Sequence, residues 1–151
     1  MPVMPIGSRY ARFLFGLGGL DMQALLPLLG RIMLAALFLS SAINKIRGFE
    51  DVSSMMSDKG IPLADVLLLG AITFLLLGSI ALILGIKARW GAVLLIVFLI
   101  PATIIFHPPT GSEEDLIQFM KNLAIAGGLC MVVAYGAGPV SFDGPSPSMK
   151  K

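Results

Sequence analysis

Five polar side chains lie within or at the ends of long apolar stretches of this chain, and they are the residues best placed to bind something: Arg31, Lys45, His107, Lys121 and Asn122. Charges within membrane-depth segments are costly and often mark a functional site. Cations and amides of this kind favour anions, carbonyl groups, the head group of a quinone, or an acidic protein surface. We therefore treat these residues as candidate ligand- or partner-binding positions.

The sequence contains no recognisable catalytic constellation. It shows no nucleophile beside a base, no phosphate-binding glycine loop and no pair of catalytic carboxylates. A metal site built from His107 and the acidic residues 113–115 is a weak reading, because there is only one histidine. We predict no catalytic residue, no metal and no cofactor other than a quinone that the protein could contact. The sequence favours a protein that is not an enzyme on its own.

Two interpretations remain open for the position of each charged side chain in an apolar stretch. Arg31 could extend along the helix to the lipid head groups, or it could face the inside of a bundle and hold an acidic or carbonyl group. The same choice applies to Lys121. Asn122 is too short to reach the head groups, so its amide should bond to another helix or to a ligand.

The elements that must position these residues are membrane-spanning helices. Of the 151 residues, 56% are hydrophobic and 13% are charged, which is too little charge to cover a soluble protein of this size. Four apolar stretches, at about residues 24–43, 63–86, 90–106 and 116–135, approach the roughly 20 residues that cross a bilayer as helix. The fold class predicted is all-α: a polytopic membrane protein with a bundle of four transmembrane helices.

The chain divides into three parts by composition. Residues 1–22 form an N-terminal tail or interfacial segment, residues 23–138 the four-helix transmembrane domain, and residues 139–151 a disordered C-terminal tail rich in proline and serine. The single cysteine, Cys130, excludes an internal disulfide. The net charge of +2 and the absence of basic runs argue against nucleic-acid binding.

Basic residues near the ends of the stretches predict the orientation. Six of them fall on the side that holds both termini and four on the other side: Arg9, Arg12, Lys87, Arg89, Lys150 and Lys151, against Lys45, Arg47, Lys59 and Lys121. The positive-inside rule then places the N- and C-termini in the cytoplasm. Without a transit-like N-terminus, the expected location is a bacterial inner (plasma) membrane.

Several motifs resemble the DoxX family of small membrane proteins. They are LLGRIMLAALFLSSAINKIRGFE, MMSDKGIP, LILGIKAR, IFH and FMKNLAIAGGL, and together they cover about residues 25–143. The resemblance implies a four-helix membrane fold. It also implies a link to redox complexes, because some relatives are subunits of quinone-reducing sulfur oxidoreductases and others partner soluble redox or detoxifying enzymes. The five candidate residues fall on the family's polar positions.

The chain departs from the family pattern at two positions. Many members carry a glutamate in the second helix where this chain has Phe74, four residues before Gly78. If that glutamate neutralises the arginine of the first helix, Arg31 lacks its usual partner here. Pro108 also replaces an aromatic residue that often follows the family's histidine.

Two functions remain as expectations. The first is a non-catalytic membrane subunit or anchor of a redox-related complex, which could contact quinone and partner a soluble redox enzyme or further copies of itself. The alternative is a membrane protein that binds or transports a lipid or another small molecule without redox chemistry. A factor that assists the assembly of other membrane proteins is a third reading.

Overall fold

The computed structural model describes residues 22–144. The predicted N-terminal segment and the last residues of the predicted tail, 145–151, lie outside this range. Within it the regular secondary structure is helical, with the following elements: α2 (Met22–Arg47), α3 (Phe49–Asp58), α4 (Ala64–Leu84), α5 (Ala88–Phe106) and α6 (Glu113–Tyr135). The all-α class predicted from the sequence is confirmed.

Four of these helices are long and apolar enough to cross a membrane: α2, α4, α5 and α6. Their ends lie within a few residues of the predicted stretches, except that α2 continues to Arg47 and α6 begins at Glu113. The start of α6 is fixed by a capping box, in which Ser112 and Asp115 exchange hydrogen bonds through their side chains and backbone amides. Large apolar side chains cover the outer faces, as a protein solvated by lipid requires.

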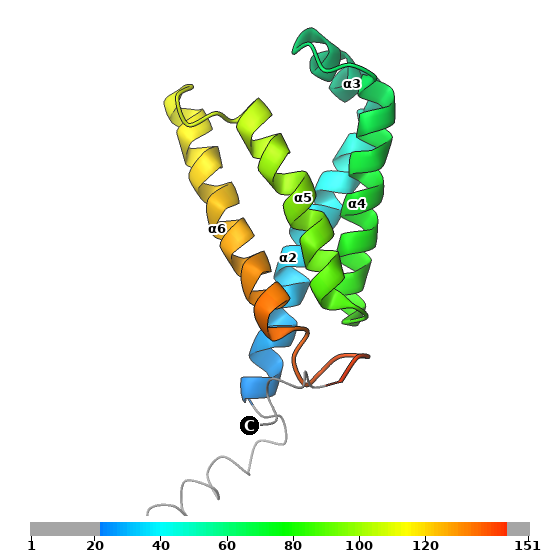
Figure 1. The fold of residues 1–151 in the computed structure, drawn as a ribbon, viewed down its shortest axis with the longest axis vertical. Coiled ribbons are helices and arrows are strands. Elements are labelled where there is room, and N and C mark those ends of the chain that lie inside the picture. Colours follow the sequence, from blue (N-terminus) through cyan, green and yellow to red (C-terminus); the bar gives the residue numbers. More distant parts are fainter. Residues whose placement is uncertain (1–21, 145–151) are drawn as a thin grey trace, which may run out of the picture.

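Helix α3 lies between the first two long helices, in a region for which the four apolar stretches predict no helix. Phe49, Val52 and Met56 recur at the spacing of one helical face and pack against Ala64 and Leu68 of α4. Two acidic residues in its first turn interact favourably with the positive end of the helix dipole. This short helix therefore covers one end of α4, and we call that end of the bundle the α3 end (Figure 1).

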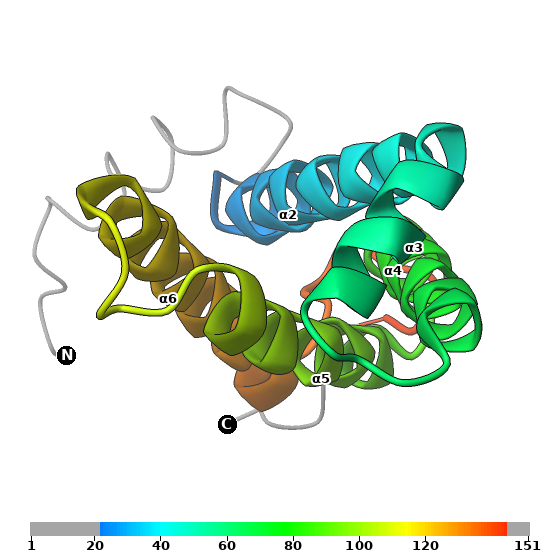
Figure 2. The same cartoon turned by 90° about the horizontal axis from the view of Figure 1, so that it is seen from above.

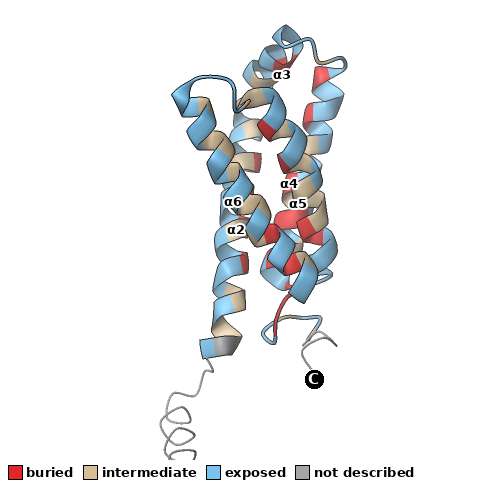
Figure 3. Ribbon diagram, turned by 60° about the vertical axis from the view of Figure 1, so that its left-hand side comes forward, coloured by how far each residue is buried: buried red, intermediate tan, exposed pale blue. Residues whose placement is uncertain are grey.

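The long helices pack in the order α2, α4, α5 and α6, each mainly against the next (Figures 1 and 2). Buried residues line the inner faces of this row, whereas the outward faces are exposed (Figure 3). Helices α4 and α5 approach each other closely at Gly78 and Gly91. A methyl group added to Gly78 would lie 2.6 Å from Leu95 Cγ and 3.0 Å from the carbonyl oxygen of Gly91. Glycine is thus needed here for the two backbones to meet.

From this contact α4 and α5 diverge toward the α3 end (Figure 1). Gly78 lies in the last third of α4, and Gly91 lies in the first turn of α5. The two helices are therefore tightly joined near the α4–α5 turn and separate in their other halves. Pro101 lies in the separating half of α5, and the helix continues through it.

The chain after α6 folds back across the α4–α5 turn. This C-terminal segment (residues 136–144) contains Gly136 and Gly138, both with positive φ, a conformation that glycine adopts without strain. The amides of Phe142 and Asp143 donate hydrogen bonds to the carbonyls of Leu84 and Gly85. Residues 139–144, which the sequence assigned to a disordered tail, thus bond to the bundle at what we call the turn end.

We expect Gly78→Ala to destabilise the bundle, because the added methyl group overlaps Leu95 and the backbone of α5. Overpacking of this kind costs about 1–3 kcal/mol. Thermal unfolding in mild detergent measures the effect. Gly70→Ala is the matched control: a methyl group there meets nothing within 4 Å, and alanine improves helix propensity. Equal stability of the two variants would show that the α4–α5 approach is not tight.

Candidate functional site

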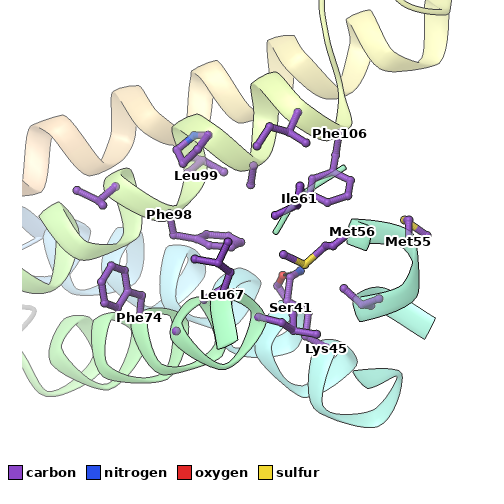
Figure 4. Close-up of a pocket in the computed structure, with 18 of the residues that line it drawn as sticks. Ser41, Lys45, Met55, Met56, Ile61, Leu67, Phe74, Phe98, Leu99 and Phe106 are labelled. Carbon is purple, nitrogen blue, oxygen red and sulfur yellow. Dashed lines mark hydrogen bonds between the residues drawn. The ribbon is translucent and has the colours of Figure 1, made fainter. Parts of the chain in front are cut away.

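A cavity of about 900 Å³ lies where α4 and α5 diverge, between α2, α3, α4 and α5 at the α3 end (Figure 4). Its walls are mostly apolar side chains from all four helices. Five polar residues also line it: Ser41, Lys45, Lys59, His107 and Asn122. An apolar cavity of this size with a few convergent polar groups has the usual composition of a small-molecule site.

Lys45 directs its ammonium group into this cavity. The residue stands in the last turn of α2, yet its Nζ donates a hydrogen bond of 3.0 Å to Ser41 Oγ, one turn back toward the start of the helix. The same nitrogen lies 5.6 Å from the centroid of the Phe98 ring, close enough for a cation–π contact. The charge is thus held by two weakly polar partners, and it makes no ion pair with any residue in the described range.

A second lysine has a similar arrangement nearer the end of α5. The ammonium of Lys59 lies 5.5 Å from the centroid of the Phe106 ring. Figure 4 shows Phe98 and Phe106 directed from α5 toward the same space as Lys45 and Ser41. Two aromatic rings of one helix therefore each face a lysine that lines the cavity.

His107 and Asn122 join the cavity from its α6 side. His107 Nδ1 lies 3.2 Å from Asp115 Oδ1, and Asp115 also belongs to the capping box of α6. Asn122 Nδ2 donates to Thr103 Oγ1 at 3.0 Å, linking α6 to α5, and the Thr103 hydroxyl donates to the carbonyl of Leu99 at 2.7 Å. The partner expected for the Asn122 amide is therefore a neighbouring helix.

Arg31 lies at the opposite end of the bundle. Its side chain is 2% exposed, and its guanidinium donates a hydrogen bond to the carbonyl of Val140 in the C-terminal segment. A methyl group on Gly85 would meet Arg31 Nη1, so the guanidinium packs directly on the α4–α5 turn. Of the two interpretations, the structure supports the one in which Arg31 faces into the protein and binds a carbonyl group.

Two nitrogens of Arg31, Nε and Nη1, are buried without a hydrogen-bond partner in the described part of the chain. The presence of Phe74 in place of the family's glutamate does not explain these unpaired nitrogens. Phe74 lines the cavity, whereas Arg31 contacts Gly85, which is about 16 Å further along α4 at 1.5 Å per residue. A carboxylate at residue 74 would thus face the cavity and would not neutralise Arg31.

The structure brings together three of the five candidate residues: Lys45, His107 and Asn122 all line the cavity. Arg31 belongs to the turn end, and Lys121 is exposed on α6 outside the cavity lining. Sequence reasoning passed over Ser41, Lys59, Phe98 and Phe106. The i, i+4 spacing of Ser41 and Lys45 indicates that their side chains can meet on one helix. The contacts of the two lysines with aromatic rings of α5 depend on how the helices pack and have no such signal in the sequence.

Comparison with known proteins agrees with the motifs. The DoxX family profile matches residues 26–108, more than half of the chain. This chain belongs to the DoxX family. The matched range includes Arg31, Lys45 and His107, whereas Lys121 and Asn122 lie beyond it.

Two proteins of Escherichia coli (strain K12) are similar over most of their length. The inner membrane protein YqjF is 28% identical over 116 residues, which is 77% of this chain and 88% of YqjF. The inner membrane protein YphA is 28% identical over 126 residues, which is 80% of this chain and 90% of YphA. No solved structure matches the chain significantly. Family membership and four apolar helices together make this DoxX protein an integral membrane protein.

We expect Arg31→Leu to release the C-terminal segment without unfolding the helices. The variant loses the charge-assisted bond to Val140, so exchange of the Phe142 and Asp143 amides should become about tenfold faster or more. Replacing a buried, incompletely paired charge by an apolar side chain is often neutral or stabilising, so the melting temperature should not fall. Hydrogen-exchange mass spectrometry in detergent measures both regions.

Arg89→Leu is the control for this experiment, because Arg89 is an exposed arginine at the same end of the bundle. Its replacement should leave the exchange of residues 140–144 near the wild-type rate. Unchanged exchange in Arg31→Leu would mean that Arg31 does not hold the segment in place.

Proposed function

We propose that this DoxX protein binds an amphipathic molecule taken from the bilayer, in the cavity at its α3 end. The observation that carries the proposal is the combination of an apolar cavity of about 900 Å³ with Lys45 and Asn122 in its wall. An apolar body would replace lipid contacts inside the cavity, and a polar head would receive hydrogen bonds from the ammonium and amide groups.

The way into the cavity supports a ligand from the membrane. Leu67 of α4 and Val97 of α5 both line the cavity, and they are 51% and 52% exposed. Because these two side chains face outward on helices that diverge, the cavity opens sideways between α4 and α5, toward lipid. A molecule already dissolved in the bilayer could enter without crossing the aqueous phase.

Membership of the DoxX family supports a second, compatible role: a non-catalytic membrane subunit or anchor of a redox-related complex. A quinone is an amphipathic membrane molecule with carbonyl oxygens, and Lys45 and Asn122 are donors suited to them. Under this proposal the cavity would hold quinone while a soluble redox enzyme docks outside the membrane. Co-purification of such an enzyme at a fixed stoichiometry would favour the redox role over lipid or solute binding alone.

The names of the two relatives support a bacterial inner membrane as the location of this chain. Combined with the distribution of basic residues, this location would put both termini in the cytoplasm and the α3 end on the other side. Attachment of a reporter enzyme to the C-terminus, active only in the cytoplasm or only outside it, tests the orientation.

Gly70→Leu should abolish ligand retention by filling the cavity. Gly70 lines the cavity, and an added side chain there meets nothing within 4 Å of its Cβ, so leucine should occupy ligand space without disturbing the helices. Native mass spectrometry of the gently extracted protein, followed by identification of any bound lipid, quinone or solute, measures the effect.

Gly127→Leu is the matched control, because Gly127 on α6 is equally open but does not line the cavity. It should keep the ligand that the wild type carries. Retention of the same ligand by Gly70→Leu would rule out the cavity as the binding site, and the absence of any bound molecule from the wild type would contradict the proposed function.

A further inference from the structure

We propose that the cavity selects a single-chain carboxylic acid, such as a long-chain fatty acid, and that its carboxylate binds the ammonium of Lys45. This inference rests on the proposed function and narrows it from amphipathic molecules in general to acidic ones. It is carried by three observations: the depth of the Lys45 charge, the charge balance of the cavity wall, and the cavity volume.

The Lys45 ammonium lies deeper in the bundle than the end of α2 at which the residue stands. Phe98, whose ring it contacts, stands near the middle of α5, and the bond to Ser41 directs the side chain back along α2. A lysine at a helix end can lower its free energy by extending outward into water. Here the side chain is directed inward, so its charge remains at membrane depth.

The cavity wall does not supply a counter-charge. Its residues include Lys45 and Lys59 but no aspartate or glutamate. Two acidic groups of this end bind other residues: Asp65 accepts a hydrogen bond from Ser53 of α3, and Asp115 binds Ser112 and His107. The other acidic residues of α3 and of the first turn of α6 are exposed and do not line the cavity: Glu50, Asp51, Asp58, Glu113 and Glu114. An unneutralised cation at membrane depth is costly, and an anion bound beside it removes much of that cost.

The immediate surroundings of Lys45 suit a carboxylate. An ammonium has three donor hydrogens, of which one bonds to Ser41 and another side faces the Phe98 ring. The Ser41 hydroxyl accepts the lysine hydrogen bond, so its own hydrogen can point to a second acceptor in the cavity. Lys45 and Ser41 can therefore each donate to one carboxylate, and charge-assisted bonds of this kind are about twice as strong as neutral ones.

The cavity volume is large enough for a single long chain. If a methylene group takes about as much space as a water molecule in the liquid, roughly 30 Å³, a sixteen-carbon acid needs roughly 500 Å³. The cavity of about 900 Å³ accommodates such an acid with its head group.

The test compares hexadecanoate with hexadecan-1-ol, which differ only in the head group. The full-length protein is placed in phosphatidylcholine nanodiscs at a pH where the acid is ionised, and the affinity for each probe is measured by titration. We expect the wild type to bind hexadecanoate at least about tenfold more tightly than the alcohol. Lys45→Met should bring this ratio close to one while leaving the affinity for the alcohol unchanged.

Two control variants separate charge at this site from charge in general. Lys45→Arg keeps a cation at the same place and should retain the preference for the acid. Arg47→Met removes a cation from the same helix end but at an exposed position that does not line the cavity, and it too should retain the preference. Binding of the alcohol by Lys45→Met shows that this variant is folded. If Lys45→Met does not fold, the comparison of Lys45→Arg with the wild type decides the test instead.

Equal affinity of the wild type for acid and alcohol would overturn the inference. If both probes were then lost in Gly70→Leu, the proposed function would stand without its preference for acids. Failure of the wild type to bind either probe would overturn the inference, and the absence of any co-purified molecule would additionally contradict the proposed function. Displacement of bound hexadecanoate by phosphatidylglycerol, but not by phosphatidylcholine, would identify an anionic phospholipid as the preferred ligand and would also overturn it.

Discussion

The contact between Gly78 and Gly91 is the constraint on which the architecture depends. It brings the backbones of α4 and α5 together near the turn that joins them, at a distance that no side chain allows. Within lipid, close backbone approach through small residues provides much of the attraction between helices. Because the contact lies near one end of both helices, their other halves can separate, and the cavity occupies the resulting space.

The two ends of the bundle hold their inward-directed cations in different surroundings. At the turn end, the C-terminal segment covers Arg31 and gives it one carbonyl acceptor, so the charge is enclosed by protein. At the α3 end, Lys45 is held by Ser41 and Phe98 beside an open cavity. A cation enclosed in this way acts as an anchor for the chain that covers it, whereas a cation beside a cavity can exchange its partner. This difference is why we propose ligand binding at the α3 end.

The structure also gives a different interpretation of Phe74, which stands where many family members have a glutamate. From the sequence, this position was a potential partner of Arg31. In the structure Phe74 lies in the cavity wall, and the contact of Arg31 with α4 is at Gly85. An aromatic side chain at residue 74 therefore makes the cavity more apolar and leaves its charge balance to the lysines. For a DoxX protein, this favours a role in holding a membrane-soluble molecule over a proton pathway that requires a carboxylate there.

The sequence by itself determined the fold class and the number of spans, because twenty-residue apolar stretches have few stable alternatives in lipid. It also suggested Lys45, His107 and Asn122 as candidates, since polar groups in such stretches are conspicuous, and the structure brings these three to one cavity. It did not reveal α3, whose short apolar stripe has meaning only once α4 lies beneath it. Nor did it reveal that Arg31 and Lys45, on one helix, belong to different sites. Tertiary structure decides that separation. The C-terminal segment folds back over one end of the bundle, and the divergence of α4 and α5 opens the other end. Neither arrangement follows from residues that are neighbours in the sequence.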